Sequence, residues 1–266
     1  MNSELYIWSV IKKHTVNNLI THRVLSTASE LYPLIRIWGQ ILASKDRSGI
    51  LLPPNYILKI LPTGSFAKGT SIVGETDLDI FISLSHKTPD NLATIYHSLA
   101  GYLKLLNFTI RQQNVSIGIS YKDLAIDLVP GKKQPGVTYD HSIYKRKAGT
   151  WTKTNIYKHI SHIKGCGRRN EIRAVKIWRK LHKLEFPSFY LELSVIEALK
   201  RRSLAKLFVN FARVLEYFSC KFENVSIVDP ANSNNIISED LSVAEKKHIA
   251  ETAYASLNQS LDSVIW

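Results

Sequence analysis

Residues 64–79 have the sequence GSFAKGTSIVGETDLD, a glycine-serine turn followed by two closely spaced aspartates. The apolar run at 57–61 predicts a buried strand, so Gly64 and Ser65 fall where a strand gives way to a short helix. Glycine lets the backbone approach an anion closely, the free amides at a helix start point outward, and the serine hydroxyl can add a hydrogen bond. This corner of the chain is therefore predicted to bind phosphate.

The two aspartates lie on a predicted strand at 77–84. Its alternating pattern places Asp77 and Asp79 on one face and the apolar residues on the other. Unpaired carboxylates in such positions repel each other, and a hard divalent cation that carries a substrate phosphate removes the repulsion. The predicted cofactor is a pair of Mg²⁺ ions, for which Mn²⁺ can substitute.

Asp127 supplies a third carboxylate. It interrupts the apolar segment 124–130, which otherwise has the pattern of a central strand, and a lone charge there needs a partner or a metal. Three aspartates with two metal ions would stabilise an in-line phosphoryl displacement, with Asp127 placed to accept the proton of the attacking hydroxyl. Two alternatives stay open: an Asp127 satisfied by backbone donors, and Asp123, whose neighbours indicate a solvated hairpin turn.

The order of these motifs, with three later segments, resembles the DNA polymerase beta-like nucleotidyltransferase superfamily. The later segments are 175–178, 188–193 and 229–235. Within the superfamily the chain is similar to the branch of oligoadenylate synthases, archaeal-type CCA-adding enzymes and bacterial cyclic GMP-AMP synthase-like nucleotidyltransferases (CD-NTases) of antiphage signalling. It is most like a bacterial CD-NTase.

The resemblance implies roles for individual residues. The glycine-serine pair would hold the nucleoside triphosphate (NTP), and the three aspartates would bind the two Mg²⁺ ions. It also implies that Lys176, together with Ser188 or Tyr190, contacts the phosphates from a helical lobe.

The predicted fold class is α+β. Residues 1–150 are expected to form N-terminal helices and a mixed-sheet catalytic lobe, and residues 151–266 a helical lobe, with the nucleotide in the cleft between them. Helices are expected at 3–13, 16–43, 90–106, 154–164, 169–184, 188–200, 203–221 and 241–260. Strands are expected near 57–61, 77–84, 108–113, 115–121 and 124–129. The second helix is expected to break at Pro33 and to be closed by residues 46–49.

Positive charge is concentrated in one part of the chain. The sequence carries 35 Lys and Arg against 22 Asp and Glu, a formal net charge of +13. The stretch 132–206 holds 19 of the basic residues and 5 of the acidic ones, so the remainder is close to neutral. The excess of positive charge lies C-terminal to Asp127 in the sequence and favours the binding of an anionic ligand.

The predicted helix at 169–184 arranges part of this charge as a basic stripe. Its cations recur at steps of three and four residues: Arg169, Arg173, Lys176, Lys180 and Lys183. One NTP cannot span so long a helix, so the stripe is expected to face a second polyanion. An acceptor nucleotide, a growing oligonucleotide or an activating nucleic acid would suit, with RNA favoured over DNA; the alternative is a solvated helix face without a ligand.

Two further patterns have competing interpretations. His159, His162 and Cys166 have the spacing of one helix face, which suits three zinc ligands or, since no fourth ligand follows nearby, plain helix surface. Aromatic residues between the basic ones are candidates to stack on bases. Trp178, however, falls on the apolar arc of its helix and is expected in the core.

Composition sets limits on location. The 266 residues are 45% hydrophobic and 21% charged, which is ordinary for a soluble globular protein. No apolar run approaches the roughly 18 residues of a membrane span, and the N-terminus lacks the order of a signal peptide. A cytoplasmic protein that does not bind membranes is expected, with Cys166 and Cys220 reduced. The oligomeric state stays open.

Three functions remain. The first is a CD-NTase that joins NTPs into a cyclic or short linear oligonucleotide messenger, which is favoured because archaeal-type CCA-adding enzymes carry further C-terminal domains. The second is a template-independent RNA nucleotidyltransferase, which the basic stripe favours. The third is a catalytically silent nucleic-acid sensor of the same fold, against which the complete set of aspartates argues.

Overall fold

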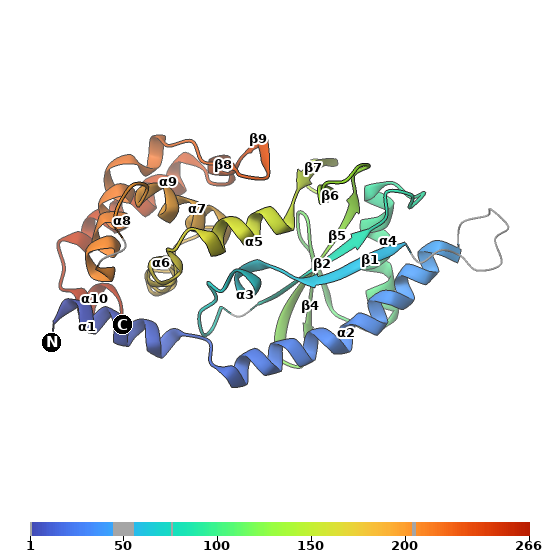
Figure 1. Ribbon diagram of the computed structural model, residues 1–266, viewed down its shortest axis with the longest axis horizontal. Helices are drawn as coiled ribbons and strands as arrows, with labels where there is room; N and C mark the ends of the chain where they lie inside the picture. Colours follow the sequence, from blue (N-terminus) through green and yellow to red (C-terminus); the bar gives the residue numbers. More distant parts are fainter. Residues whose placement is uncertain (1, 45–55, 76, 204–205) are drawn as a thin grey trace. The chain divides into compact units, whose positions relative to one another are not determined.

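The computed structural model describes residues 2–44, 56–75, 77–203 and 206–266 (Figure 1). The chain forms two compact units. The sheet unit contains residues 17–67 and 76–160, and the helical unit contains residues 1–16, 68–75 and 161–266. The units interleave along the sequence, whereas we expected a single division near residue 150. The helical unit takes in the N-terminal helix and the segment 68–75 that follows the glycine-serine turn.

Among the described residues, a seven-stranded mixed sheet forms the centre of the sheet unit. Its strands are β1 (Ile57–Pro62), β2 (Leu78–Leu84), β3 (Ile110–Gln112), β4 (Ile117–Tyr121), β5 (Leu124–Lys133), β6 (His141–Lys145) and β7 (Thr150–Thr154). The order is β1-β2-β5-β4-β3, with β6 paired to the end of β5 and β7 paired to β6. β2 and β5 run parallel, and the pairs β1–β2, β4–β5 and β5–β6 are antiparallel. This mixed sheet with its helices confirms the predicted α+β class.

Two helices, α2 (Asn18–Ser44) and α4 (Leu92–Leu105), contribute to the core on one face of the sheet (Figure 1). The alternation of β2 selects that face, because even-numbered residues such as Ile80 are fully buried there with Trp38 of α2. Each large apolar side chain that is buried in this way contributes about 1.5–3 kcal/mol. The odd-numbered residues of β2, among them Asp79, therefore point to the other face.

α2 continues through Pro33, so the predicted break at this residue is wrong. A proline inside a helix removes one backbone hydrogen bond and costs about 3 kcal/mol. On both sides of it the helix buries Leu31, Ile35 and Trp38, each at most 2% exposed. Burial of this stripe offsets the cost. The predicted closing residues, 46–49, lie outside the described part of the chain.

The helical unit consists mainly of the N-terminal helix and helices from the C-terminal part of the chain. They are α1 (Ser3–His14), α6 (Arg169–Leu181), α7 (Ser188–Ala198), α8 (Leu207–Lys221), α9 (Val243–Leu257) and α10 (Leu261–Val264). Two more helices run across the boundary between the units, namely α3 (Gly64–Lys68) and α5 (Ile156–Gly165). A short hairpin joins β8 (Val228–Asp229) and β9 (Asn232–Ile236).

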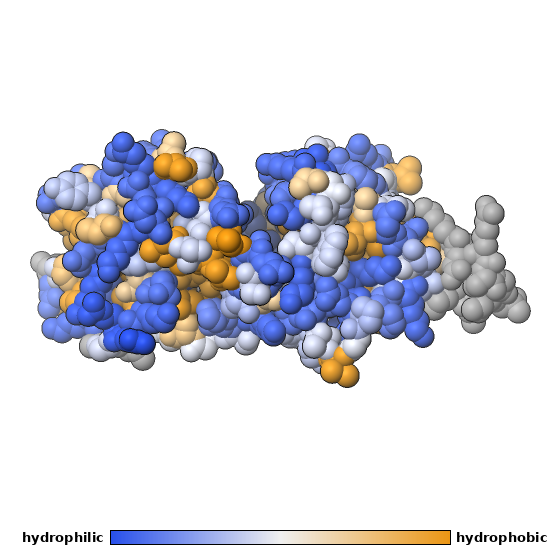
Figure 2. Space-filling view, turned by 90° about the horizontal axis from the view of Figure 1, so that it is seen from above, coloured by the Kyte–Doolittle hydropathy of each residue, from blue (hydrophilic) through white to orange (hydrophobic). Residues whose placement is uncertain are grey.

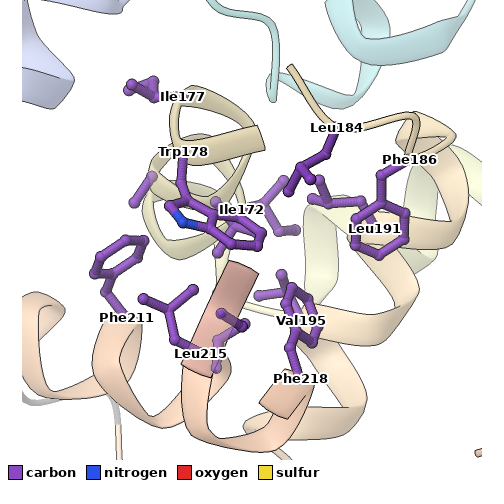
Figure 3. Close-up of a cluster of buried hydrophobic side chains, with 14 of the residues drawn as sticks. Ile172, Ile177, Trp178, Leu184, Phe186, Leu191, Val195, Phe211, Leu215 and Phe218 are labelled. Carbon is purple, nitrogen blue, oxygen red and sulfur yellow. The ribbon is translucent and has the colours of Figure 1, made fainter. Parts of the chain in front are cut away.

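An aromatic core holds the helical unit together (Figure 3). Trp178 is fully buried, its ring centroid lies 6.1 Å from that of Phe218 of α8, and its indole nitrogen donates a 3.0 Å hydrogen bond to Ser256 Oγ of α9. The hydrogen bond satisfies the polar atom of an otherwise apolar side chain. Trp178 is therefore a core residue, and it cannot stack on a base.

The surface is largely polar. Hydrophilic residues cover most of the face shown in Figure 2, and hydrophobic residues form smaller patches between them. Within the described residues, no helix combines the length and apolar character of a membrane span.

Candidate active site

Asp79 and Asp127 lie side by side on two parallel strands. In the register of β2 and β5, Asp79 pairs with Asp127, and the preceding residues Leu78 and Ile126 pair in the same way. Neighbouring strands lie about 4.8 Å apart, and paired residues point to the same face of a sheet. Since Leu78 and Ile126 are buried in the core under the helices, the two carboxylates share the opposite face.

Gly64 lies against Asp79. It begins α3 with a φ of 61°, and a Cβ atom built on it would lie 1.6 Å from Asp79 Oδ2. No side chain fits there unless the carboxylate moves. The amide of Thr63 donates a 2.7 Å hydrogen bond to the carbonyl of Asp79, which fixes the turn on β2. The glycine-serine turn, with the half-buried Ser65, is thus next to the carboxylates.

The surroundings of Asp127 perturb its carboxyl group. Burial raises its pKa, and the negative charge of Asp77 raises it further. Gln113 and Arg111 oppose this shift, and the side-chain amide of Gln113 donates a 2.8 Å hydrogen bond to Asp127 Oδ1. Gly118 pairs with Asp127 from β4 and leaves room for it, because a Cβ there would lie 2.9 Å from the same oxygen. The site therefore favours a carboxyl group that can take up a proton.

Asp79 and Asp127 suit a hard divalent cation, because they supply carboxylate oxygens from paired positions on neighbouring strands. Carboxylate oxygens are the ligands that Mg²⁺ and Mn²⁺ prefer, and adjacent backbone positions supply them. Asp77, two positions before Asp79, is exposed. Over the described ranges, no three His, Cys, Asp or Glu side chains are gathered tightly enough to hold a metal ion. Carboxylates repel one another, so these side chains would close together only around a cation.

The three residues expected to contact phosphate from the helical lobe have other contacts. Lys176 is 1% exposed and forms a 2.8 Å ion pair with Glu192. Ser188 is exposed and accepts a 3.0 Å hydrogen bond from Arg179. Tyr190 is fully buried, and burial raises the pKa of its hydroxyl. In this conformation the Lys176 ammonium and the Tyr190 ring are enclosed in the helical unit.

The basic stripe is interrupted, because its middle member, Lys176, is buried. Arg169 is exposed, and Arg173 is half-buried with a 3.2 Å hydrogen bond to Asn170. Lys180 is exposed and donates a 3.0 Å hydrogen bond to the carbonyl of Val73. Lys183 lies beyond the end of α6, with a φ of 52°. The remaining cations thus form two groups, one on each side of the buried Lys176.

The residues considered for zinc do not form a site within the described chain. Cys166 donates a 3.0 Å hydrogen bond to the carbonyl of Ile163, and no cluster of three His, Cys, Asp or Glu includes it there. Burial raises the pKa of the Cys166 thiol, which disfavours the thiolate that zinc binds.

Sequence reasoning missed a buried charge cluster in the helical unit. Glu192 accepts from Lys68 at 2.9 Å, from Lys176 at 2.8 Å and from Thr70 at 2.5 Å. A signal was present, because Glu192 lies in the apolar stretch 188–195, where a charge needs a partner. The partners could not be assigned, since Lys68 and Glu192 are far apart in the sequence.

Comparison with known proteins gives the fold. No protein-family model matches the chain. The chain superposes on CdnC of E. coli MS115-1, in its complex with HORMA-deltaN, with a TM-score of 0.74 at 20% identity, covering 95% of this chain and 88% of that one. It superposes on the CD-NTase CdnG of Bradyrhizobium diazoefficiens, in complex with GTP, with a TM-score of 0.73 at 12% identity, covering 97% and 91%. This chain has the CD-NTase fold.

A curated relative extends the likeness to the sequence. This chain is 28% identical over 186 residues to a cyclic AMP-AMP-AMP synthase of Escherichia coli (strain MS 115-1). The match covers 62% of this chain and 57% of the relative, so the chain spans less than two thirds of the length of that protein. The resemblance to bacterial CD-NTases that we expected from the motifs is confirmed.

Proposed function

We propose that this chain is a nucleotidyltransferase that uses a divalent metal to join NTPs into a cyclic or short linear oligonucleotide messenger. The observation that carries the proposal is the register of β2 and β5, which pairs Asp79 with Asp127 on the face of the sheet opposite α2 and α4, with Asp79 next to Gly64. The sequence likeness to a cyclic AMP-AMP-AMP synthase supports the type of product.

The reaction follows from what each group can do. The turn at Gly64 and Ser65 would hold the triphosphate of the donor NTP. A hydroxyl of the acceptor nucleotide would attack the α-phosphorus, its new O–P bond forming as the bond to the β-phosphate oxygen breaks and pyrophosphate leaves. Asp127, whose pKa is raised by burial, would take the proton of that hydroxyl.

The aspartates would also hold the metal cofactor. Two Mg²⁺ ions bound by Asp77, Asp79 and Asp127 would stabilise the attacking and leaving oxygens. Asp79 lies closest to the phosphate-binding turn, since it touches the position of a Gly64 side chain. Asp127, on the neighbouring strand, would then face the acceptor nucleotide. We thus propose that Asp79 acts at the donor phosphate and that Asp127 acts at the acceptor hydroxyl.

Labelled NTPs would distinguish this proposal from the two alternatives. Purified protein is incubated with Mg²⁺ or Mn²⁺ and each labelled NTP, with and without RNA or DNA, and the products are separated by chromatography. Phosphatase-resistant compounds of a few nucleotides support the messenger synthase. Label appended to the added RNA supports an RNA nucleotidyltransferase. Absence of incorporation under every condition, with tight binding of nucleic acid, supports a silent sensor.

We also propose that the activity serves antiphage signalling in the cytoplasm and depends on a protein partner. The solved structure of CdnC that this chain resembles contains HORMA-deltaN, which supports control by a bound protein. Product formation would then rise when the cognate partner is added to the incubation. Unchanged product formation with every candidate partner would contradict this part of the proposal.

A further inference from the structure

Glu192 sits in a buried cluster that ties three parts of the helical unit together. Its side chain, on α7, is 0% exposed and accepts from the ammonium groups of Lys176 on α6 and Lys68 at the end of α3. Thr70, just after α3, donates to the same carboxylate and also accepts a 3.2 Å hydrogen bond from Lys176. One carboxylate therefore holds two lysines and a threonine from separate elements.

The cluster holds charged groups in a buried environment. Burial alone would raise the pKa of Glu192, but the charges of Lys176 and Lys68 lower it to about 2. The side chains of Lys68 and Lys176 are only 10% and 2% exposed. Apolar residues of similar size often stabilise a core as well as a buried ion pair does, whereas a buried ion pair fixes geometry more specifically. The presence of this buried ion cluster is thus better explained by its fixing the positions of Lys68 and Lys176 than by a gain in stability.

The cluster and two further contacts hold the segment 68–75 on α6 and α7. Lys68 is fixed at the start of the segment by Glu192, and its ammonium group also lies over the ring of Phe189 of α7, with the nitrogen 4.3 Å from the ring centroid. In the middle, the carbonyl of Val73 accepts from Lys180. At the end, Glu75 pairs with Arg179.

The anchored Lys68 is also the last residue of α3, and α3 begins at Gly64. A helix of five residues is little more than one turn, so fixing its last residue limits how its first residues can rotate. Gly64 is limited as well, because it lies against Asp79. Any freedom of the turn at Gly64 and Ser65 therefore depends on how firmly Lys68 is held.

We propose that Glu192 is a positioning residue: by holding Lys68 it sets the orientation of the Gly64–Ser65 turn that receives the triphosphate. The proposal rests on the proposed function, because it assigns the turn to a bound NTP. It adds that a residue in the helical unit, without contact to the reacting atoms, controls the affinity for the NTP.

Lys68→Met tests the proposal. Methionine removes the ammonium but keeps an apolar, unbranched side chain of similar length, and it leaves Glu192 paired with Lys176, so the protein should stay folded. We expect the Kd for a non-hydrolysable ATP analogue and the KM for ATP to rise about tenfold or more, because small displacements of binding groups are costly. Lys68→Arg should restore most of the affinity, since it keeps the charge.

Lys200→Met is the matched control. Lys200 is 64% exposed and pairs with Glu197 of the same helix end, outside the cluster. It should leave affinity and KM unchanged. Glu192→Gln should raise KM as Lys68→Met does and, because it leaves two lysines without their carboxylate, also lower the melting temperature. Wild-type Kd and KM in folded Lys68→Met protein would overturn the proposal.

Hydrogen exchange separates this proposal from the proposed function. Should the wild-type protein neither bind nor convert any NTP, the proposed function fails, and the anchor is judged by exchange of the amides of residues 64–75. Faster exchange in Lys68→Met, and not in Lys200→Met, supports the anchor. Equal exchange in the two variants contradicts it.

Discussion

At the scale of single residues, the site contains a conflict between stability and function. Asp127 is half-buried beside Asp79, and burial together with the charge of Asp77 raises its pKa. A raised carboxyl pKa means that the group favours folding at low pH, and that this contribution is lost as the pH rises through the raised value. At neutral pH the ionised Asp127 therefore opposes folding in the absence of a cation. The catalytic role proposed for Asp127 would account for this cost.

Replacing Asp127 with Asn removes this conflict. The amide oxygen can still accept from Gln113, and the repulsion by the neighbouring aspartates disappears. We expect Asp127→Asn to raise the melting temperature at pH 7 without metal while it abolishes incorporation of NTPs. Differential scanning calorimetry with EDTA measures the first effect. A gain that is equally large at pH 3, where the wild-type carboxyl is protonated, would contradict the electrostatic explanation.

Gly64 is expected to tolerate no side chain. A methyl group there meets Asp79, and the φ of 61° is unfavourable for other residues. We expect Gly64→Ala to cost about 1–3 kcal/mol of stability and to lower kcat/KM at least a hundredfold, because the carboxylate must move. Gly149→Ala is a matched control with a φ of 62° and open space. It should cost similar backbone strain and leave kcat/KM unchanged.

At the scale of elements, local patterns gave most of the fold. Apolar runs predicted β1 and β5, alternation predicted β2, and helical spacing predicted α4 and α6 to α9, with ends displaced by a few residues. The β6–β7 hairpin was missed, although His141–Lys145 and Thr150–Thr154 flank an Ala-Gly turn. Its strands carry Lys, Ser and Thr between few apolar residues, which weakens the period-two signal.

Local sequence could predict which aspartate belongs to the site, but it could not predict contacts between residues that are distant in the sequence. The choice of Asp127 over Asp123 followed from local sequence, and Asp123 indeed lies in the β4–β5 turn with a φ of 59°. The burial of Lys176 depends on Glu192 and Thr70, and no local pattern connects them. Helical spacing placed Lys176 on a polar stripe, while tertiary ion pairing placed it in the interior.

The β4–β5 turn offers a test at this scale. Lys122 and Asp123 both have positive φ, which is the geometry of a two-residue type I′ turn that favours glycine at the second position. The side chain of Asp123 is 97% exposed, and its carboxylate lies 3.6 Å from Arg23. An ion pair this exposed contributes little to stability, so its loss on substitution costs little. We expect Asp123→Gly to raise the free energy of unfolding by about 0.5–1 kcal/mol. Urea unfolding followed by fluorescence measures this change, and a decrease would contradict the turn assignment.

At the scale of the whole molecule, charge links stability to pH. The pKa of Glu192 is lowered to about 2 in the folded protein, so its contribution is present above its unfolded pKa and is lost as the pH falls toward 2. We expect the wild-type protein to lose about 3 kcal/mol between pH 5 and pH 2 from this residue. Glu192→Gln should be less stable at pH 7 and show a smaller loss. Parallel stability curves for the two proteins would contradict the ion-pair account.

The proposed function requires that the paired aspartates bind a divalent cation together with an NTP. The most direct measurement is titration of Mn²⁺ into protein saturated with a non-hydrolysable ATP analogue, followed by electron paramagnetic resonance. We predict that wild-type protein binds Mn²⁺ and that Asp79→Asn and Asp127→Asn each weaken binding at least tenfold, because each removes a ligand oxygen charge on one strand of the pair. Equal Mn²⁺ affinity in the wild type and both variants would contradict the assignment of this site.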